Sequence, residues 1–184
     1  MQAWVWILIA VAAVIVVAIA VFGWLEARRK RLKNTFGPEY DRAVSEAPSR
    51  REAEADLEDR RKRRDDLEIR PLSRSAAERY GHEWESIQVR FVDDPVGATR
   101  DADRLTERVM ADRGYPMQDF DVQADLVSVD HPTVVENYRE AHATFLAYDR
   151  GDASTEDLRL AMVHYRSLFA ELVAADERQP EEVR

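Results

Sequence analysis

The chain has 184 residues, a formal net charge of −9 and no cysteine, which excludes disulfides, thiol catalysis and thiolate metal sites. The charge is unevenly distributed, because residues 71–184 contain 13 Arg, no Lys and 24 acidic side chains, a balance of −11. Such an acidic segment repels a phosphate backbone, so we expect no nucleic-acid partner.

The first predicted element is an apolar helix that crosses a membrane. Residues 3–25 carry no charged side chain, and a helix of this length rises about 34 Å, enough for a hydrocarbon core of about 30 Å. Trp4, Trp6 and Trp24 lie near its two ends, where aromatic rings favour the headgroup boundary. We therefore expect residues 1–25 to be a retained anchor in the lipid bilayer. The apolar run is too long for a cleaved signal peptide, and no basic residue precedes it.

A basic cluster directly after the apolar run predicts the orientation of the anchor. Its members are Arg28, Arg29, Lys30, Arg31 and Lys33. Because basic residues stay on the cytoplasmic side, we expect the N-terminus outside and residues 26–184 in the cytoplasm. The inverted orientation remains an alternative. Small residues along the run would also let two anchors approach closely and form a homo-oligomer; these are Ala3, Ala10, Ala13 and Ala20.

Residues 26–70 are predicted to be a charged helical connector rather than a folded unit. Pro38 and Pro48 interrupt it, because proline lacks the backbone donor that a helix interior needs. Acidic residues stand four positions before basic ones in its second half, which supports a helix. The apolar positions there are too sparse for a coiled-coil seam, so we expect a solvated helix; they are Ala53, Leu57 and Leu67. The basic run 60–64 resembles a nucleic-acid patch, but acidic neighbours largely cancel it.

Residues 71–175 are predicted to form an all-α domain. Apolar residues recur there at steps of three and four in four long segments, and no segment alternates as a strand does. The first stripe is Ala77, Tyr80, Trp84, Ile87 and Phe91, and the last is Leu158, Ala161, Met162, Tyr165, Leu168, Phe169 and Leu172. Four long helices and one short piece predict a four- to five-helix antiparallel bundle. The charged residues 176–184 are expected to be a disordered tail.

Capping residues mark the ends of these predicted helices. Ser75 and Glu78 have the spacing of a capping box. Asp94 precedes a first-turn proline and is a suitable N-cap. Ser154 is followed three residues later by an acid and is expected to cap the last helix, while Gly114 is expected to end the second one.

Several short phrases resemble a known family. They are Phe91-Val-Asp-Asp-Pro95, Arg113-Gly-Tyr-Pro116, Ser128-Val-Asp-His-Pro132 and His164-Tyr-Arg-Ser-Leu-Phe169. Together they resemble a family of uncharacterised bacterial, mainly actinobacterial, proteins with a single membrane anchor and a helical domain. The resemblance covers about residues 71–173, and Phe36-Gly-Pro-Glu-Tyr40 recurs with the anchor in many members. It implies a protein of the bacterial inner (cell) membrane and implies no activity.

Four histidines are the groups that titrate nearest neutral pH. His142 and His164 would lie on neighbouring helices and, with a carboxylate, would complete a metal site. No His-x-x-x-His or Glu-x-x-His spacing supports such a site, so the structural alternative is that His142 borders the core, His131 serves a helix entry and His82 is solvated. We expect no metal and no cofactor.

The dipeptide Tyr-Arg occurs on each of the last two predicted helices, as Tyr138-Arg139 and Tyr165-Arg166. Paired guanidinium groups could bind a carboxylate or a phosphate. The structural alternative, which we favour, places the tyrosines in the core and pairs the arginines with the abundant carboxylates of the domain.

The sequence therefore predicts a membrane-anchored cytoplasmic interaction module that binds an unknown protein and catalyses no reaction. Serine nucleophile elbows, phosphate-binding glycine loops and zinc motifs are absent from the sequence. The alternative is a metal-binding or small-ligand-binding bundle, enzymatic or not, that uses His142 and His164.

Overall fold

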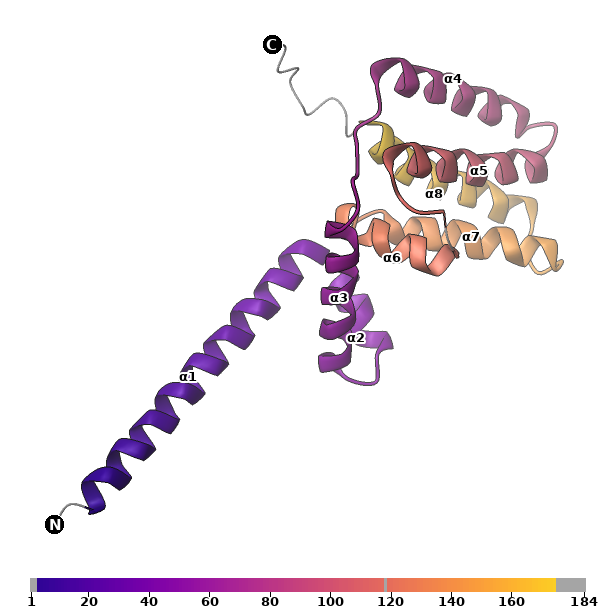
Figure 1. The fold of residues 1–184 in the computed structure, drawn as a ribbon. Helices are drawn as coiled ribbons and strands as arrows, with labels where there is room; N and C mark the ends of the chain where they lie inside the picture. Colours follow the sequence, from indigo (N-terminus) through magenta and orange to yellow (C-terminus); the bar gives the residue numbers. More distant parts are fainter. Residues whose placement is uncertain (1–2, 118, 175–184) are drawn as a thin grey trace, which may run out of the picture. The chain divides into compact units, whose positions relative to one another are not determined.

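The computed structural model describes residues 3–117 and 119–174, in which eight helices and no strand occur (Figure 1). The expected all-α class is confirmed. The chain divides after Glu58 into two compact units, residues 1–58 and 59–184. The predicted tail, residues 176–184, lies outside the described residues.

The first unit is dominated by a long apolar helix. It contains α1 (Ala3–Phe36), α2 (Pro38–Glu46) and the first half of α3 (Arg50–Asp65). By length and composition, α1 is the one helix in the described residues that could cross a membrane, and none of its apolar window is buried. It continues past the predicted end of the anchor, because the basic cluster contains no helix-stopping residue. Gly37, with a φ of 48°, ends it and Pro38 begins α2.

The connector is more packed than the sequence analysis predicts. Leu32 and Phe36 of α1, Tyr40 of α2 and Leu57 of α3 are each at most 2% exposed. The Tyr40 hydroxyl donates a hydrogen bond of 2.7 Å to Glu54 and so links α2 to α3. The prediction of a solvated helix in the second half of the connector therefore needs correction, because Ala53 and Leu57 of α3 are 1% and 0% exposed. Apolar side chains are sparse in residues 26–70, yet those at the end of α1, on α2 and on α3 are largely buried.

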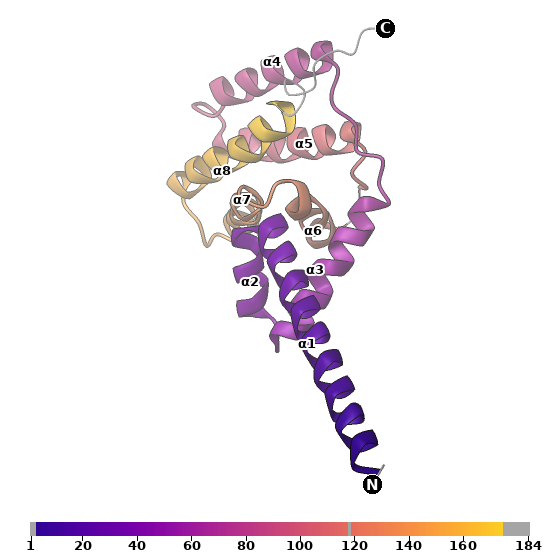
Figure 2. The same cartoon turned by 90° about the vertical axis from the view of Figure 1, so that its left-hand side faces the viewer.

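The second unit consists of helices in three layers (Figure 2). Its helices after α3 are α4 (Arg74–Arg90), α5 (Pro95–Arg113), α6 (Phe120–Asp130), α7 (Val135–Asp149) and α8 (Thr155–Ala174). One layer is α4, the middle layer is α5 with α8, and the third is α6 with α7. Helix α8 packs against α4, α5 and α7. Every predicted inward residue of the last stripe is buried, as are Tyr80, Trp84 and Ile87 of the first.

The capping predictions are confirmed at two helices and wrong at one. Asp94 accepts a 2.9 Å hydrogen bond from the Gly97 amide. Ser154 and Asp157 cap α8 reciprocally, with amide-to-side-chain distances of 2.7 and 3.3 Å. Helix α4, however, is capped by Ser73, which accepts from the Ala76 amide at 3.2 Å. An equivalent serine two positions earlier starts the helix sooner, so Ser75 lies inside the first turn.

The turn after α5 requires a glycine. Gly114 ends α5 as predicted, with a φ of 100°, and the Arg70 amide donates to the Arg113 carbonyl at 2.8 Å. The connection from α3 to α4 therefore passes directly over the end of α5. A Cβ atom at position 114 would lie only 2.5 Å from the backbone oxygen of Glu68.

Two glycine substitutions test this close approach. Gly151 also has a positive φ, 84°, but a Cβ there meets nothing within 4 Å. We expect Gly151→Ala to lower the free energy of unfolding by about 1 kcal/mol, the cost of left-handed backbone strain. Gly114→Ala should cost about 3 kcal/mol, because the Glu68 backbone must also move. Urea denaturation followed by circular dichroism measures both, and equal losses would contradict the packing of Glu68 against the end of α5.

Candidate functional site

A group of titratable side chains lies between the middle and third layers of the second unit. Asp103 and Glu107 come from α5, Tyr138 and His142 from α7, and Tyr165 from α8. We call these five residues the polar cluster. The two residues from α5 and the two from α7 are each four positions apart, so each pair lies on one face of its helix.

Ring stacking and hydrogen bonds to α6 hold the α7 side of the polar cluster. The His142 ring stacks on Phe120, with 3.8 Å between ring centroids and 9° between ring planes. Its Nδ1 atom lies 3.8 Å from Asp103 Oδ1, an electrostatic contact that is too long for a hydrogen bond. The Tyr138 hydroxyl donates to Gln123 Oε1 at 3.2 Å. The histidine ring therefore has a defined orientation and an acidic neighbour.

Burial controls the protonation of this cluster. Burial first, and then the nearby Asp103 carboxylate, raise the pKa of both Tyr138 and Tyr165. Burial and Asp103 also raise the pKa of Glu107, while His142 opposes that shift. The two tyrosines thus remain protonated at neutral pH and can act as hydrogen-bond donors but not as bases. The Tyr165 hydroxyl is fully buried, and the Asp103 carboxylate is the charged group that acts on it most strongly.

His142 and His164, the two residues of the alternative metal or ligand site, lie beside different carboxylates. His142 faces Asp103, whereas His164 Nδ1 lies 3.0 Å from Glu140 Oε2. No group of three or more His, Cys, Asp or Glu side chains in residues 3–117 and 119–174 has a geometry that could hold a metal ion. The two histidines therefore belong to different electrostatic environments.

The other two histidines differ in burial. His82 is exposed, as expected. His131 is only 7% exposed, and its Nδ1 atom lies 3.0 Å from Glu171 Oε2. It follows the end of α6 rather than opening α7, which begins only at Val135. His131 therefore connects the end of α6 to α8.

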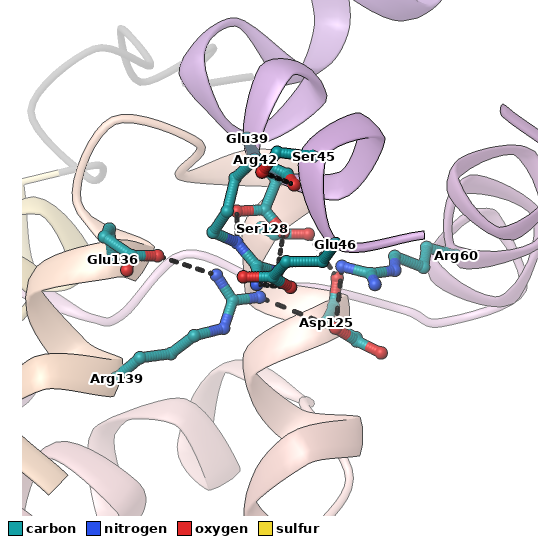
Figure 3. A network of polar contacts seen from close by, with 9 residues as sticks. All are labelled: Glu39, Arg42, Ser45, Glu46, Arg60, Asp125, Ser128, Glu136 and Arg139. Carbon is teal, nitrogen blue, oxygen red and sulfur yellow. Dashed lines mark hydrogen bonds and ion pairs between the residues drawn. The ribbon is translucent and has the colours of Figure 1, made fainter. Parts of the chain in front are cut away.

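Arg139 is paired with carboxylates, as the structural alternative for the Tyr-Arg units predicts. In Figure 3 it lies between Asp125 and Glu136, at nitrogen-to-oxygen distances of 3.5 and 3.4 Å. Arg60 approaches the same Asp125 oxygen at 2.7 Å. One carboxylate of α6 thus joins α3 to α7 within the second unit. The basic run 60–64 is therefore partly used in internal ion pairs.

The membrane-interface residues predicted from the sequence all lie on α1. Trp4, Trp6 and Trp24 are 60%, 69% and 63% exposed. Of the basic cluster, Lys30, Arg31 and Lys33 are exposed, and Arg28 and Arg29 are half-buried. Arg28 donates to the Glu54 carbonyl oxygen at 3.5 Å. Three of the five cationic groups therefore face the solvent.

The α5 side of the polar cluster was not predicted from the sequence. Asp103 and Glu107 directly follow Ala102 and Thr106, which are both fully buried. Two acids spaced by four at the edge of an apolar stripe are the signal that could have identified them. Their nearness to Tyr165 depends on how α5 packs on α8, and no local pattern contains that information.

Comparisons with known proteins give no match. No protein-family model matches the chain, and no curated protein or solved structure is significantly similar to it.

The raised pKa of Glu107 predicts a pH dependence of stability. The folded state holds the proton of the Glu107 carboxyl more tightly than the unfolded chain does. The stabilisation that this protonated carboxyl gives is therefore fully present below its ordinary pKa of 4.5 and is lost as the pH rises through the raised pKa. The unmodified chain should therefore lose free energy of unfolding between pH 4 and pH 7 through Glu107. Glu107→Gln should make this loss smaller.

Urea denaturation at several pH values between 4 and 7 measures this effect. Glu78→Gln serves as the control, because Glu78 is exposed on α4 and should leave the pH profile nearly unchanged. An identical profile for the unmodified chain and Glu107→Gln would contradict the raised pKa.

Proposed function

We propose that the chain is a single-pass protein of the bacterial inner membrane whose helical domain binds a protein partner in the cytoplasm. The observation that carries the proposal is α1, whose apolar window has a mean hydropathy of 3.0 and no buried residue. An exposed apolar surface of this extent is rare on soluble monomers and requires another environment. A bilayer supplies that environment over the full length of the window.

The orientation rests on the basic cluster. Lys30, Arg31 and Lys33 are exposed directly after the apolar window, where they would contact anionic headgroups of the cytoplasmic leaflet. The resemblance to bacterial membrane-anchored proteins supports the same location. In this proposal Trp24 lies at the cytoplasmic boundary, and Trp4 and Trp6 lie at the outer one.

The chemistry of the second unit supports binding rather than catalysis. We propose that α4, α5, α7 and α8 form an antiparallel bundle, and that the polar cluster, whose tyrosines are held protonated, lies between α5, α7 and α8. His142 and His164 face different carboxylates, so the alternative in which they share one site has no geometric support. The proposed partner is a protein that meets the domain at the membrane surface.

Reporter fusions test the orientation. A phosphatase fused after Arg184 should be inactive and a fluorescent protein at the same position should be bright, because the first needs export and the second folds in the cytoplasm. Replacing all five members of the basic cluster by Gln should produce mixed orientations without preventing insertion. Replacing Arg61, Lys62 and Arg63 by Gln is the matched control and should change nothing, since these residues are distant from α1 in the sequence. An active external phosphatase, or a mature chain that lacks residues 1–25, would contradict the proposal.

Cross-linking in native membranes tests the interaction. Full chains with the unmodified α1, or with residues 3–25 replaced by an unrelated apolar helix, should give the same cross-linked partners, and deletion of residues 1–25 should remove them. Changing His142 and His164 together to Gln should leave the partners unchanged. Loss of partners in that double variant, with circular dichroism unaltered, would favour a site that uses the histidines.

A further inference from the structure

An apolar pocket lies between α4 and α8, away from the polar cluster. Its volume is about 600 Å³, within the usual range for small-molecule sites. Trp84 and Phe169 line it with stacked rings, 4.7 Å between centroids and 21° between planes. The remaining apolar lining is mostly small, namely Ala77, Ala170, Val173 and Ala174. Small side chains beside two large rings leave room for an apolar molecule.

The charged side chains at this pocket are unusual for the domain. Arg74 of α4 and Arg166 of α8 line it together with a single acid, Glu78. Neither arginine makes an ion pair with another described residue. Arg139, the corresponding residue of the other Tyr-Arg unit, contacts two carboxylates. In a segment with a charge balance of −11, two guanidinium groups without a carboxylate partner among residues 3–117 and 119–174 mark a place suited to an anion.

We propose that this pocket binds a small apolar carboxylate, a molecule with one hydrocarbon body and one anionic head. The hydrocarbon lies against Trp84 and Phe169, and the carboxylate lies between Arg74 and Arg166, whose planar guanidinium groups bind carboxylates with two parallel hydrogen bonds. This inference is independent of the proposed membrane anchoring.

Two other occupants fit the pocket less well. A neutral apolar molecule would leave both guanidinium groups without a counter-charge. The chain itself continues from Ala174, but residues 175–184 include four acids and only Ala175, Pro180 and Val183 as apolar residues. That composition would fill an apolar pocket poorly.

Quenching of Trp84 fluorescence tests the proposal. The chain has four tryptophans, so the full chain with Trp4, Trp6 and Trp24 changed to Phe reports on Trp84 alone. In lipid nanodiscs, ω-bromoundecanoate should quench this fluorescence saturably, because its bromine would lie close to the indole ring. The uncharged ω-bromoundecanol should bind at least about tenfold more weakly, a difference of about 1.4 kcal/mol. No saturable quenching, or equal affinity for the acid and the alcohol, would overturn the proposal.

Charge variants of the same reporter chain sharpen the test. Changing Arg74 and Arg166 together to Gln should weaken binding of the carboxylate at least about tenfold, whereas Glu78→Gln should strengthen it. Arg159→Gln is the matched control, because Arg159 lies on the same helix but is paired with Glu156 at 2.7 Å. Circular dichroism establishes that each variant remains folded. Unchanged affinity in the double arginine variant would overturn the proposal.

A truncation distinguishes the remaining occupant. If residues 175–184 filled the pocket, deleting them would shift the Trp84 emission and strengthen binding of ω-bromoundecanoate. That result would assign the pocket to the chain itself and overturn the proposal. We expect no shift and the same affinity after the deletion.

Discussion

The packing of α8 against three other helices is the interaction on which the second unit depends. The residues of α8 that face α4, α5 and α7 are buried along the whole helix. The last turn is also secured, because the buried Arg113 donates to the Leu172 carbonyl at 2.5 Å. This bond satisfies a carbonyl that a helix end leaves unpaired, and it places a positive charge at the negative end of the helix dipole. Both the polar cluster and the apolar pocket take their geometry from this one helix.

Charge pairing explains how so acidic a unit stays folded. Asp125 lies against both Arg60 and Arg139, and Arg64 lies 2.7 Å from Asp130. These arginines offset the repulsion among carboxylates and join helices that are far apart in the sequence. Salt screens such partly buried pairs less than exposed ones. Each of them therefore contributes more to the arrangement of α3, α6 and α7 than an exposed pair would.

Local features of the fold could be predicted from the sequence, and contacts between helices could not. Asp94, Ser154 and Gly114 were identified because a cap depends on residues only a few positions apart. The apolar stripes were identified because one helix face repeats at a fixed period. The burial of Leu32 and Leu57 was not predicted, because it depends on contacts between helices and not on the few apolar residues of each one. The α5 side of the polar cluster was missed for the same reason, since Asp103 gains its importance only from the tyrosines that α7 and α8 bring to it.

The unbroken course of α1 has a mechanical consequence. The helix runs from Ala3 to Phe36 without an interruption, so its exposed apolar part and its buried end at Leu32 and Phe36 are one rigid rod. Rotation or tilt of the rod within a bilayer would turn the buried end through the same angle. Each added residue advances a helix by about 100° around its axis. The number of residues between Trp24 and Leu32 therefore fixes the angle between the face of α1 that carries Trp24 and the face that is buried at Leu32. A membrane helix that packs against one face of the apolar part of α1 would thereby also fix the rotation of its buried end.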